Sequence, residues 1–166
     1  MKTTEPHYIP FDGVRVRYDS DKPFDEVVAA LLADVGDEPG LSDVTAKAPS
    51  DWAEYQQRVQ SRIGPSEFML FSLIDHSTWL PKAGIDRKVL RVIIGNPVIA
   101  LTMLRHDVTA GLFAPVELLV VDRPGDRSAV TYVQPSSLMV VEPNPDLLAA
   151  ARELDGKLAA LVAAVV

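Results

Sequence analysis

The sequence predicts a single α+β domain in which an antiparallel sheet carries helices on one face. Five short segments are rich in β-forming residues, the last two of them are joined by a tight turn, and amphipathic helical segments are interspersed among them. Strands that are neighbours in sequence tend to be neighbours in space. A length of 166 residues with 48% hydrophobic residues suffices for one core, so we expect one domain over 1–166.

A strand followed by a helix is expected at the start of the chain. In GVRVRYD (13–19), two valines and a tyrosine alternate with arginines, which is the two-residue period of a strand with one solvent-exposed face. Ser20 and Asp21 then offer capping oxygens for a helix. Its apolar residues recur at helical spacing as far as Gly36.

Residues 37–66 are expected to form a loop and an extra helix. The first part of this segment mixes glycine, proline, serine and aspartate without a period, which indicates a surface loop. Ser50 is the predicted cap of a helix that ends before Gly64. Trp52 and Tyr55 belong to its narrow apolar stripe, which we expect to face the core.

The remaining strands come from four apolar runs. Two of them, at 67–75 and 88–94, are bounded by turn residues and rich in β-formers. Segments 115–122 and 128–135 are joined by RPGDR, which predicts an antiparallel hairpin. The chain then ends in an amphipathic helix, with Asn144 as its cap and a proline in the first helical position.

The segment GNPVIALTMLRHD (95–107) is the first candidate for a functional site. Asn96 and Pro97 occupy the cap and first-turn positions of a predicted helix, directly after a strand that ends at Gly95. A helix N-terminus behind a glycine presents backbone N–H groups that can bind a carboxylate or phosphate. A capping role and a role in a small anion site both stay open.

The segment LIDHSTW (73–79) is the second candidate. Asp75 and His76 end an apolar strand, and imidazole is the side chain most easily poised for proton transfer near neutral pH. Neighbours on a strand point to opposite faces, so a turn-stabilising role for the histidine stays open as well. Tyr132 in VTYVQP is a candidate hydrogen-bond donor, with a packing role as the alternative.

Composition argues against several functions. A net charge of −7 and a pI near 4.9 repel the phosphate backbone, so no nucleic-acid partner is expected. The chain has no cysteine, no P-loop or dinucleotide-binding motif and no G-x-S-x-G sequence. A metal site would need His76, His106 and nearby acids to converge without helical metal-ligand spacing, so no metal is expected.

We expect a cytoplasmic protein that does not cross a membrane. The opening MKTTEPHYIPFDG lacks the apolar region of a signal peptide. No apolar run approaches the roughly 18 residues of a membrane span.

Four stretches between residues 68 and 139, FSLIDHS, RVIIGNP, LFAPVELLVVD and VTYVQPSSLM, resemble in this order the bacterial and archaeal family known as domain of unknown function 302. The first strand and the PFDEVVAALLADVG helix resemble the opening of the same family. Simpler members pass from the first helix to the next strand by a short turn, so 37–66 is an insertion by comparison. The most specific shared residues are His76, Gly95, Asn96, Pro97, Tyr132 and Pro135.

The resemblance implies a fold similar to one half of the TATA-binding protein, a curved antiparallel sheet backed by helices, and assembly as a homodimer. It does not imply DNA binding, because fold alone does not carry function, and it leaves the activity and any cofactor unknown.

Three functions stay open at this point. The favoured one is a binding or accessory protein in which Asp75, His76, Gly95, Asn96 and Tyr132 surround a small anionic or aromatic metabolite. The first alternative is an enzyme of the hydrolase or isomerase type that uses His76 as general acid or base, with backbone donors at the Gly-Asn pair stabilising negative charge. The second alternative is a protein-protein interaction module that uses the extra helix or the C-terminal helix.

Overall fold

The structure, a computed structural model, describes residues 5–166. The first four residues, part of the opening segment that lacks a signal-peptide pattern, lie outside the described range. The strands are β1 (Arg15–Ser20), β2 (Met69–Asp75), β3 (Val89–Gly95), β4 (Val116–Arg123) and β5 (Arg127–Val133). The α-helices are α1 (Phe24–Val35), α2 (Leu41–Val44), α3 (Trp52–Gln60), α4 (Pro97–Leu104), α5 (Pro135–Met139) and α6 (Pro145–Val165). The predicted α+β class and all predicted strands are confirmed.

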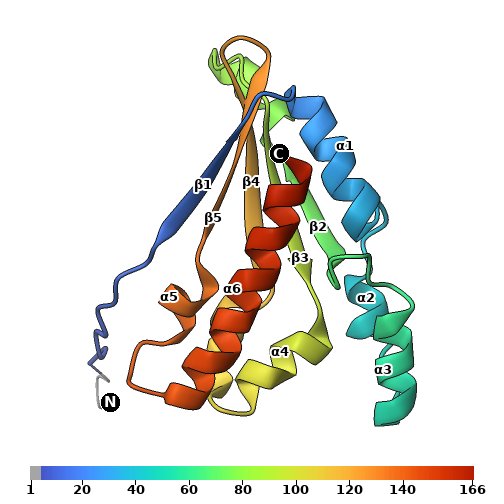
Figure 1. Ribbon diagram of the computed structural model, residues 1–166, viewed down its shortest axis with the longest axis vertical. Coiled ribbons are helices and arrows are strands. Elements are labelled where there is room, and N and C mark those ends of the chain that lie inside the picture. Colours follow the sequence, from blue (N-terminus) through green and yellow to red (C-terminus); the bar gives the residue numbers. More distant parts are fainter. Residues whose placement is uncertain (1–4) are drawn as a thin grey trace.

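The five strands form one open antiparallel sheet in the order β1-β5-β4-β3-β2. The predicted hairpin is formed by β4 and β5, where Arg123 lies opposite Arg127. Gly125 in its turn has a φ of 81°, which a glycine adopts without strain. The two long helices α1 and α6 cover the same face of the sheet, and α2 and α3 lie beyond its β2 side (Figure 1).

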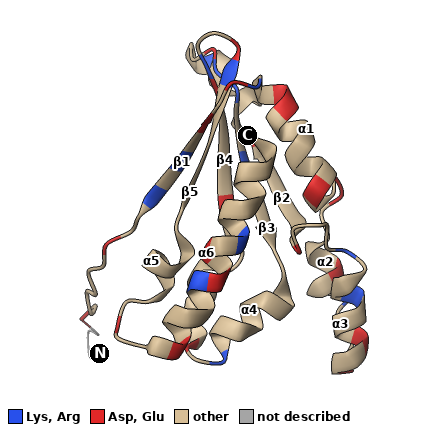
Figure 2. Ribbon diagram, viewed as in Figure 1, with Lys and Arg blue, Asp and Glu red and all other residues tan. Residues whose placement is uncertain are grey.

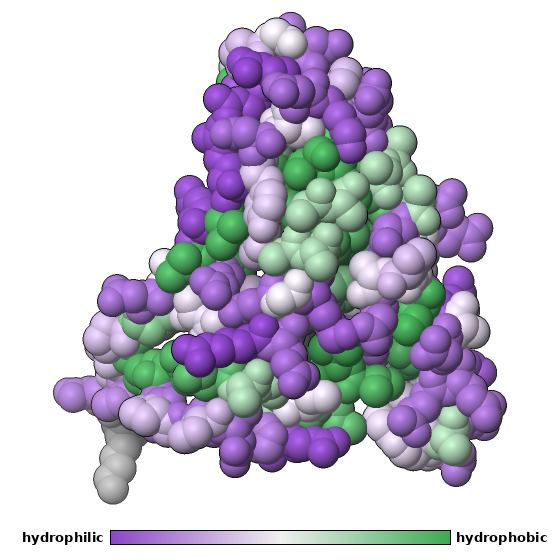
Figure 3. All heavy atoms as spheres, in the orientation of Figure 1, coloured by the Kyte–Doolittle hydropathy of each residue, from purple (hydrophilic) through white to green (hydrophobic). Residues whose placement is uncertain are grey.

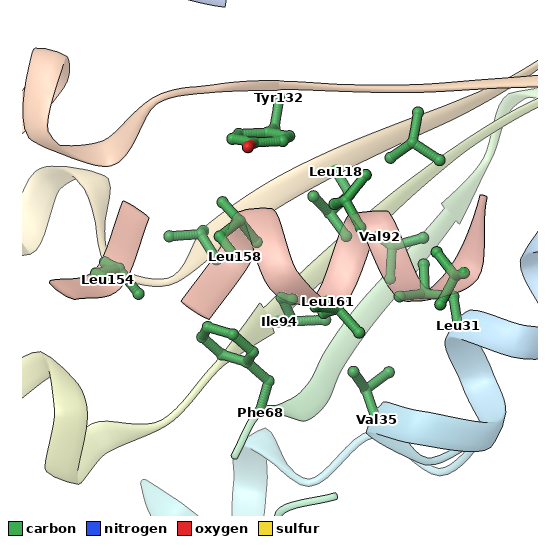
Figure 4. Close-up of a cluster of buried hydrophobic side chains, with 14 of the residues drawn as sticks. Leu31, Val35, Phe68, Val92, Ile94, Leu118, Tyr132, Leu154, Leu158 and Leu161 are labelled. Carbon is green, nitrogen blue, oxygen red and sulfur yellow. The ribbon is translucent and has the colours of Figure 1, made fainter. Parts of the chain in front are cut away.

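The core lies between that covered face and the two long helices. Helix α6 contributes a stripe of buried side chains at helical spacing, which includes Leu154, Leu158 and Leu161. These side chains meet alternate residues of the strands, such as Val92 and Leu118 (Figure 4). On β3 and β4 the buried residues alternate with more exposed ones, so the opposite face of the sheet carries a different set of side chains.

Helix beginnings differ from the predictions at two places. Ser20 ends β1, and its hydroxyl accepts from the Lys22 N–H at 3.1 Å, so α1 begins after Pro23 without a side-chain cap. The cap of α3 is Asp51 and not Ser50, because the Asp51 carboxylate accepts the Glu54 N–H at 2.9 Å. The predicted caps Asn96 and Asn144 are confirmed.

The segment 37–66 also differs in detail. Its loop contains the four-residue helix α2, which the sequence pattern did not predict. The expected core position of Trp52 is wrong, because this side chain is 48% exposed and stacks on Tyr55 with ring centroids 5.4 Å apart. Val59 and Ile63 instead pack with Val44 into a small second cluster against β2.

Three short 3₁₀ helices, His76–Thr78, Leu80–Ala83 and Val108–Phe113, were not predicted either. The QPSSLM segment contains helix α5, which the sequence pattern did not predict. Within residues 5–166, no helix combines the length and the apolar character that crossing a membrane requires.

The Tyr132 phenol gives the fold a predicted alkaline sensitivity. Burial, with smaller contributions from Tyr18 and Asp155, raises the pKa of Tyr132 to about 12. The phenol of an unfolded chain ionises near pH 10. Between these values the unfolded state loses the proton first, so the free energy of unfolding falls as pH rises from about 10 to about 12. Denaturant unfolding at several pH values should show a shallower fall for Tyr132→Phe; equal slopes would contradict the assignment.

Candidate functional site

Asn96 joins three parts of the chain at the beginning of α4. Its Oδ1 accepts the N–H groups of Val98 at 2.9 Å and Ile99 at 3.3 Å, and its Nδ2 donates to the Glu67 carbonyl at 2.8 Å. Glu67 lies in the turn before β2 and has a φ of 69°, a backbone conformation that residues other than glycine rarely adopt. The hydrogen bond from Asn96 therefore stabilises this unusual turn. Asn96 is buried and uses both polar atoms of its amide group within the protein.

Close packing favours glycine at position 95. A Cβ atom here would lie 2.9 Å from the Phe71 ring, closer than Cβ atoms normally come, and a tight 3.3 Å from Pro115. Gly95, Asn96 and Pro97 form one wall of a cleft of about 250 Å³, which we call the Gly-Asn-Pro cleft. Its other walls come from α2, α3, α4 and the core, and its remaining lining residues are mostly apolar.

Asp75 and His76 lie at the other end of the β2-β3 pair. Met69 pairs with Gly95, whereas Asp75 pairs with Leu90. The two motifs are therefore six residue steps apart along β2, a distance of roughly 20 Å. Neither Asp75 nor His76 lines the Gly-Asn-Pro cleft, so the structure does not bring the two motifs together.

The Asp75 carboxylate caps the turn and does not orient the histidine. It accepts the Ser77 N–H at 2.8 Å. The His76 ring packs edge-on against Trp79, with centroids 5.7 Å apart. Its Nδ1 is buried and has no hydrogen-bond partner among the described residues.

The candidate donor Tyr132 and the acid beside His106, Asp107, occupy structural positions. Tyr132 is 5% exposed and belongs to the cluster of buried side chains (Figure 4). Its ring stacks on Tyr18, with centroids 6.4 Å apart. The Asp107 carboxylate accepts from the Thr109 hydroxyl and N–H, and these bonds lower the pKa of Asp107. Within 5–166, no three histidine or carboxylate side chains gather in a way that could hold a metal ion.

A larger space than the Gly-Asn-Pro cleft lies on the sheet face that α1 and α6 leave open. This space, which we call the arginine hollow, has a volume of about 1090 Å³. The side chains of Leu119 and Val121 on β4 and of Thr131 and Val133 on β5 belong to its floor. Five arginines surround that floor: Arg15, Arg17, Arg87, Arg91 and Arg123. Figure 2 shows basic residues on β1 and at the β4-β5 turn.

Strand register places two of these arginines at the ends of one row. Arg17 lies opposite Thr131, Thr131 opposite Leu119, and Leu119 opposite Arg91. Directly opposed residues share a face of the sheet, so Thr131 and Leu119 lie between Arg17 and Arg91 on one face. Three strand spacings place the two arginine backbones about 14 Å apart.

Carboxylates hold four of the five guanidinium groups in place. Asp19 binds Arg17, with 2.9 Å to Nε, and also binds Arg123. Glu117 binds Arg91, again at 2.9 Å to Nε, and Asp122 binds Arg87 at 2.7 Å. Arg15 has no carboxylate partner among the described residues. A guanidinium has five N–H donors, so each paired arginine keeps donors for a further acceptor.

Sequence reasoning missed the arginine hollow. The alternation in GVRVRYD predicts that Arg15 and Arg17 lie on the solvent-exposed face of their strand, and both residues are exposed in the structure. Nothing local indicated that Arg91 and Arg123, from two other strands, share that face. The pairing of all five strands decides this, and it depends on long-range contacts.

Comparisons with known proteins give a family and a fold. The family model described as domain of unknown function DUF302 matches residues 43–165. The crystal structure of an uncharacterized conserved DUF302 protein from Bacillus stearothermophilus matches with a TM-score of 0.63 and 16% sequence identity. That match covers 92% of this chain and 98% of the other. The comparison with curated proteins finds no match.

The double role of Asn96 predicts a measurable loss of stability. Asn96→Ala removes the cap of α4 and leaves the Glu67 carbonyl without its donor, so unfolding should become easier by about 2 kcal/mol. Asn96→Asp keeps the capping oxygen and should cost less. Asn144→Ala, which removes the cap of α6, is the matched control at about 1 kcal/mol. Urea denaturation measures all three; a smaller loss for Asn96→Ala than for Asn144→Ala would contradict the double role.

Proposed function

This chain belongs to the family described as domain of unknown function DUF302, and we propose that it is a small-molecule binding protein whose ligand is an anion with an apolar body. The proposed site is the arginine hollow. The observation that carries the proposal is the gathering of five of the 16 basic residues around one apolar sheet surface, in a chain with a net charge of −7.

Charge supports an anionic ligand. The lining of the hollow contains five arginines and one acidic residue, Glu117. Ion pairs with Asp19, Glu117 and Asp122 fix the directions of four guanidinium groups before any ligand arrives. Preorganised guanidinium groups bind carboxylate, sulfonate or phosphate oxygens through paired N–H donors.

The floor of the hollow supports an apolar ligand body. Between the arginines lie Leu119, Val121 and Val133, and Leu112 at one end is 81% exposed. Apolar side chains left exposed in a concave surface are typical of binding sites. The volume of about 1090 Å³ is slightly above the usual range of roughly 300–1,000 Å³ for small-molecule sites, so a small ligand fits.

Arg15 offers the sharpest test, because its removal leaves no carboxylate without a partner. The probe is 1-anilinonaphthalene-8-sulfonate, an aromatic anion whose fluorescence reports binding. We expect saturable binding whose Kd rises with salt, and about tenfold weaker binding by Arg15→Ala. Arg152→Ala, at an exposed arginine of α6 on the other side of the sheet, should bind like the unmodified protein.

The uncharged analogue N-phenyl-1-naphthylamine has the same rings without the sulfonate. It should bind more weakly than the anion, and its affinity should not depend on salt. Equal affinity of Arg15→Ala and Arg152→Ala for the anion, or salt-independent binding of the anion, would contradict the proposal.

Acid-base catalysis by His76 receives no support from the geometry. This residue lines neither of the two spaces described above, and its Asp75 neighbour caps a turn. Binding is therefore the function that we propose.

A homodimer, which the family resemblance implies, fits the free edge of the sheet. β2 is an outer strand. The Gly40 N–H donates to the Leu70 carbonyl and covers the first half of its edge. The second half carries Leu73 and Ile74, each 36% exposed, beside Trp79, which is 50% exposed. We propose that a second copy pairs along this half, since unpaired strand edges readily bind another strand.

Ile74→Lys tests the proposed dimer edge. A charge at this exposed position should shift sedimentation from dimer toward monomer while the circular dichroism spectrum stays unchanged. Val108→Lys, at another exposed apolar residue that is remote in sequence from β2, is the control and should leave the dimer intact. A monomeric unmodified protein, or an Ile74→Lys variant that remains dimeric, would overturn the assignment.

A further inference from the structure

The Gly-Asn-Pro cleft is a second space. It shares only two lining residues with the arginine hollow. It lies where α4 begins, between the core and the α2-α3 pair. Core side chains such as Phe68, Met103 and Leu154 line its inner part, and Leu41 of α2, which is 41% exposed, lies at its rim. Hydrophobic side chains gather on this part of the surface, over α4 and toward α2 (Figure 3). Pro115 and Val116 line both spaces and so stand between them.

The polar side chains of the cleft are already occupied within the protein. Only Thr45, Tyr55 and Asn96 among the lining residues carry polar side-chain groups, and no lining residue is charged. The Thr45 hydroxyl donates to the Leu41 carbonyl at 2.7 Å, and the Tyr55 hydroxyl donates to the Val44 carbonyl at 3.0 Å. Asn96 uses its amide oxygen and nitrogen as described above.

An anion would gain little in this cleft. The N-terminus of α4 borders it, but the Asn96 side chain already accepts the N–H groups of Val98 and Ile99. An anion would therefore lose its hydration without a charged partner or a free donor side chain in return. The small anion site that the sequence left open at this motif receives no support.

Water is also a poor occupant. A bound water needs two to four polar partners, and the side chains here offer few unused ones. Water in this open cleft finds few hydrogen-bond partners on its apolar walls, so an apolar molecule that displaces this water gains affinity.

We propose that the Gly-Asn-Pro cleft binds one small, uncharged apolar molecule of about the size of a single substituted aromatic ring. An apolar cavity of about 150 Å³ accommodates benzene, so the volume here leaves room for a short substituent. This site is separate from the arginine hollow, and the inference does not depend on the function proposed there.

The experiment compares ethylbenzene with benzoate, which has a ring of the same size and a negative charge. Backbone amide shifts of the full chain are recorded by NMR during titration with each compound. We expect ethylbenzene to shift amides of α4 and of residues 41–45, with a Kd that does not change with salt. Benzoate should bind this cleft more than about tenfold more weakly, because its carboxylate would be buried without a partner.

A filled cleft supplies the matched variant. Ala100 of α4 lines the cleft, so Ala100→Leu should abolish the ethylbenzene shifts. Ala33→Leu makes the same change at an exposed position of α1 and should bind ethylbenzene normally. The amide shifts of the unmodified protein locate the ligand even if Ala100→Leu does not fold.

Three results would overturn the proposal. The first is the absence of saturable ethylbenzene shifts up to the solubility limit. The second is shifts that map to the open sheet face and not to α4. The third is a folded Ala100→Leu variant that binds as well as Ala33→Leu. The effect of Arg15→Ala on anilinonaphthalene sulfonate binding changes none of these outcomes. The two proposed sites are therefore tested independently.

Discussion

The packing of α6 against one face of the sheet is the contact on which the rest of the structure depends. Its buried leucines and valines, with Val27, Leu31 and Val35 of α1, cover alternate residues of the strands. Burial of this apolar area is the main favourable term in folding. Both long helices pack on this one face, so neither α1 nor α6 covers the opposite face of the sheet. That one-sided cover creates the arginine hollow.

The uncovered face explains how an acidic chain comes to display a basic surface. Side chains there must tolerate water, and alternation along each strand keeps arginine out of the core. The ion pairs with Asp19 and Glu117 are partly exposed, so they contribute little to stability. Their main effect is geometric, because they fix the direction of the guanidinium groups around Leu119 and Thr131. The proposed binding at this surface therefore depends on the arrangement of its charges more than on the net charge of the chain.

The two spaces differ in chemistry because their polar groups are used differently. Around the hollow, arginines keep N–H donors after pairing with carboxylates, and Arg15 is left without a carboxylate partner among residues 5–166. Around the cleft, Asn96, Tyr55 and Thr45 direct their polar atoms to neighbouring backbone. The first arrangement suits an anion and the second an uncharged molecule. A motif that looks chemical in sequence, such as Gly-Asn-Pro, can thus shape a site while its polar groups serve the fold.

The sequence by itself determined the local elements and their class. Two-residue alternation, capping residues and the Pro-Gly turn identified the strands, most helices and the hairpin, because these signals act within a few residues. Where two capping residues stood side by side, as at Ser50 and Asp51, only the structure showed which oxygen is used.

The site was decided by tertiary structure. Pairing of β2 with β3 separates His76 from Asn96, and the register across β1, β5, β4 and β3 brings Arg17 and Arg91 into one row. A single strand's period fixes which of its own residues share a face, but the row that they join depends on strand pairing over the whole chain.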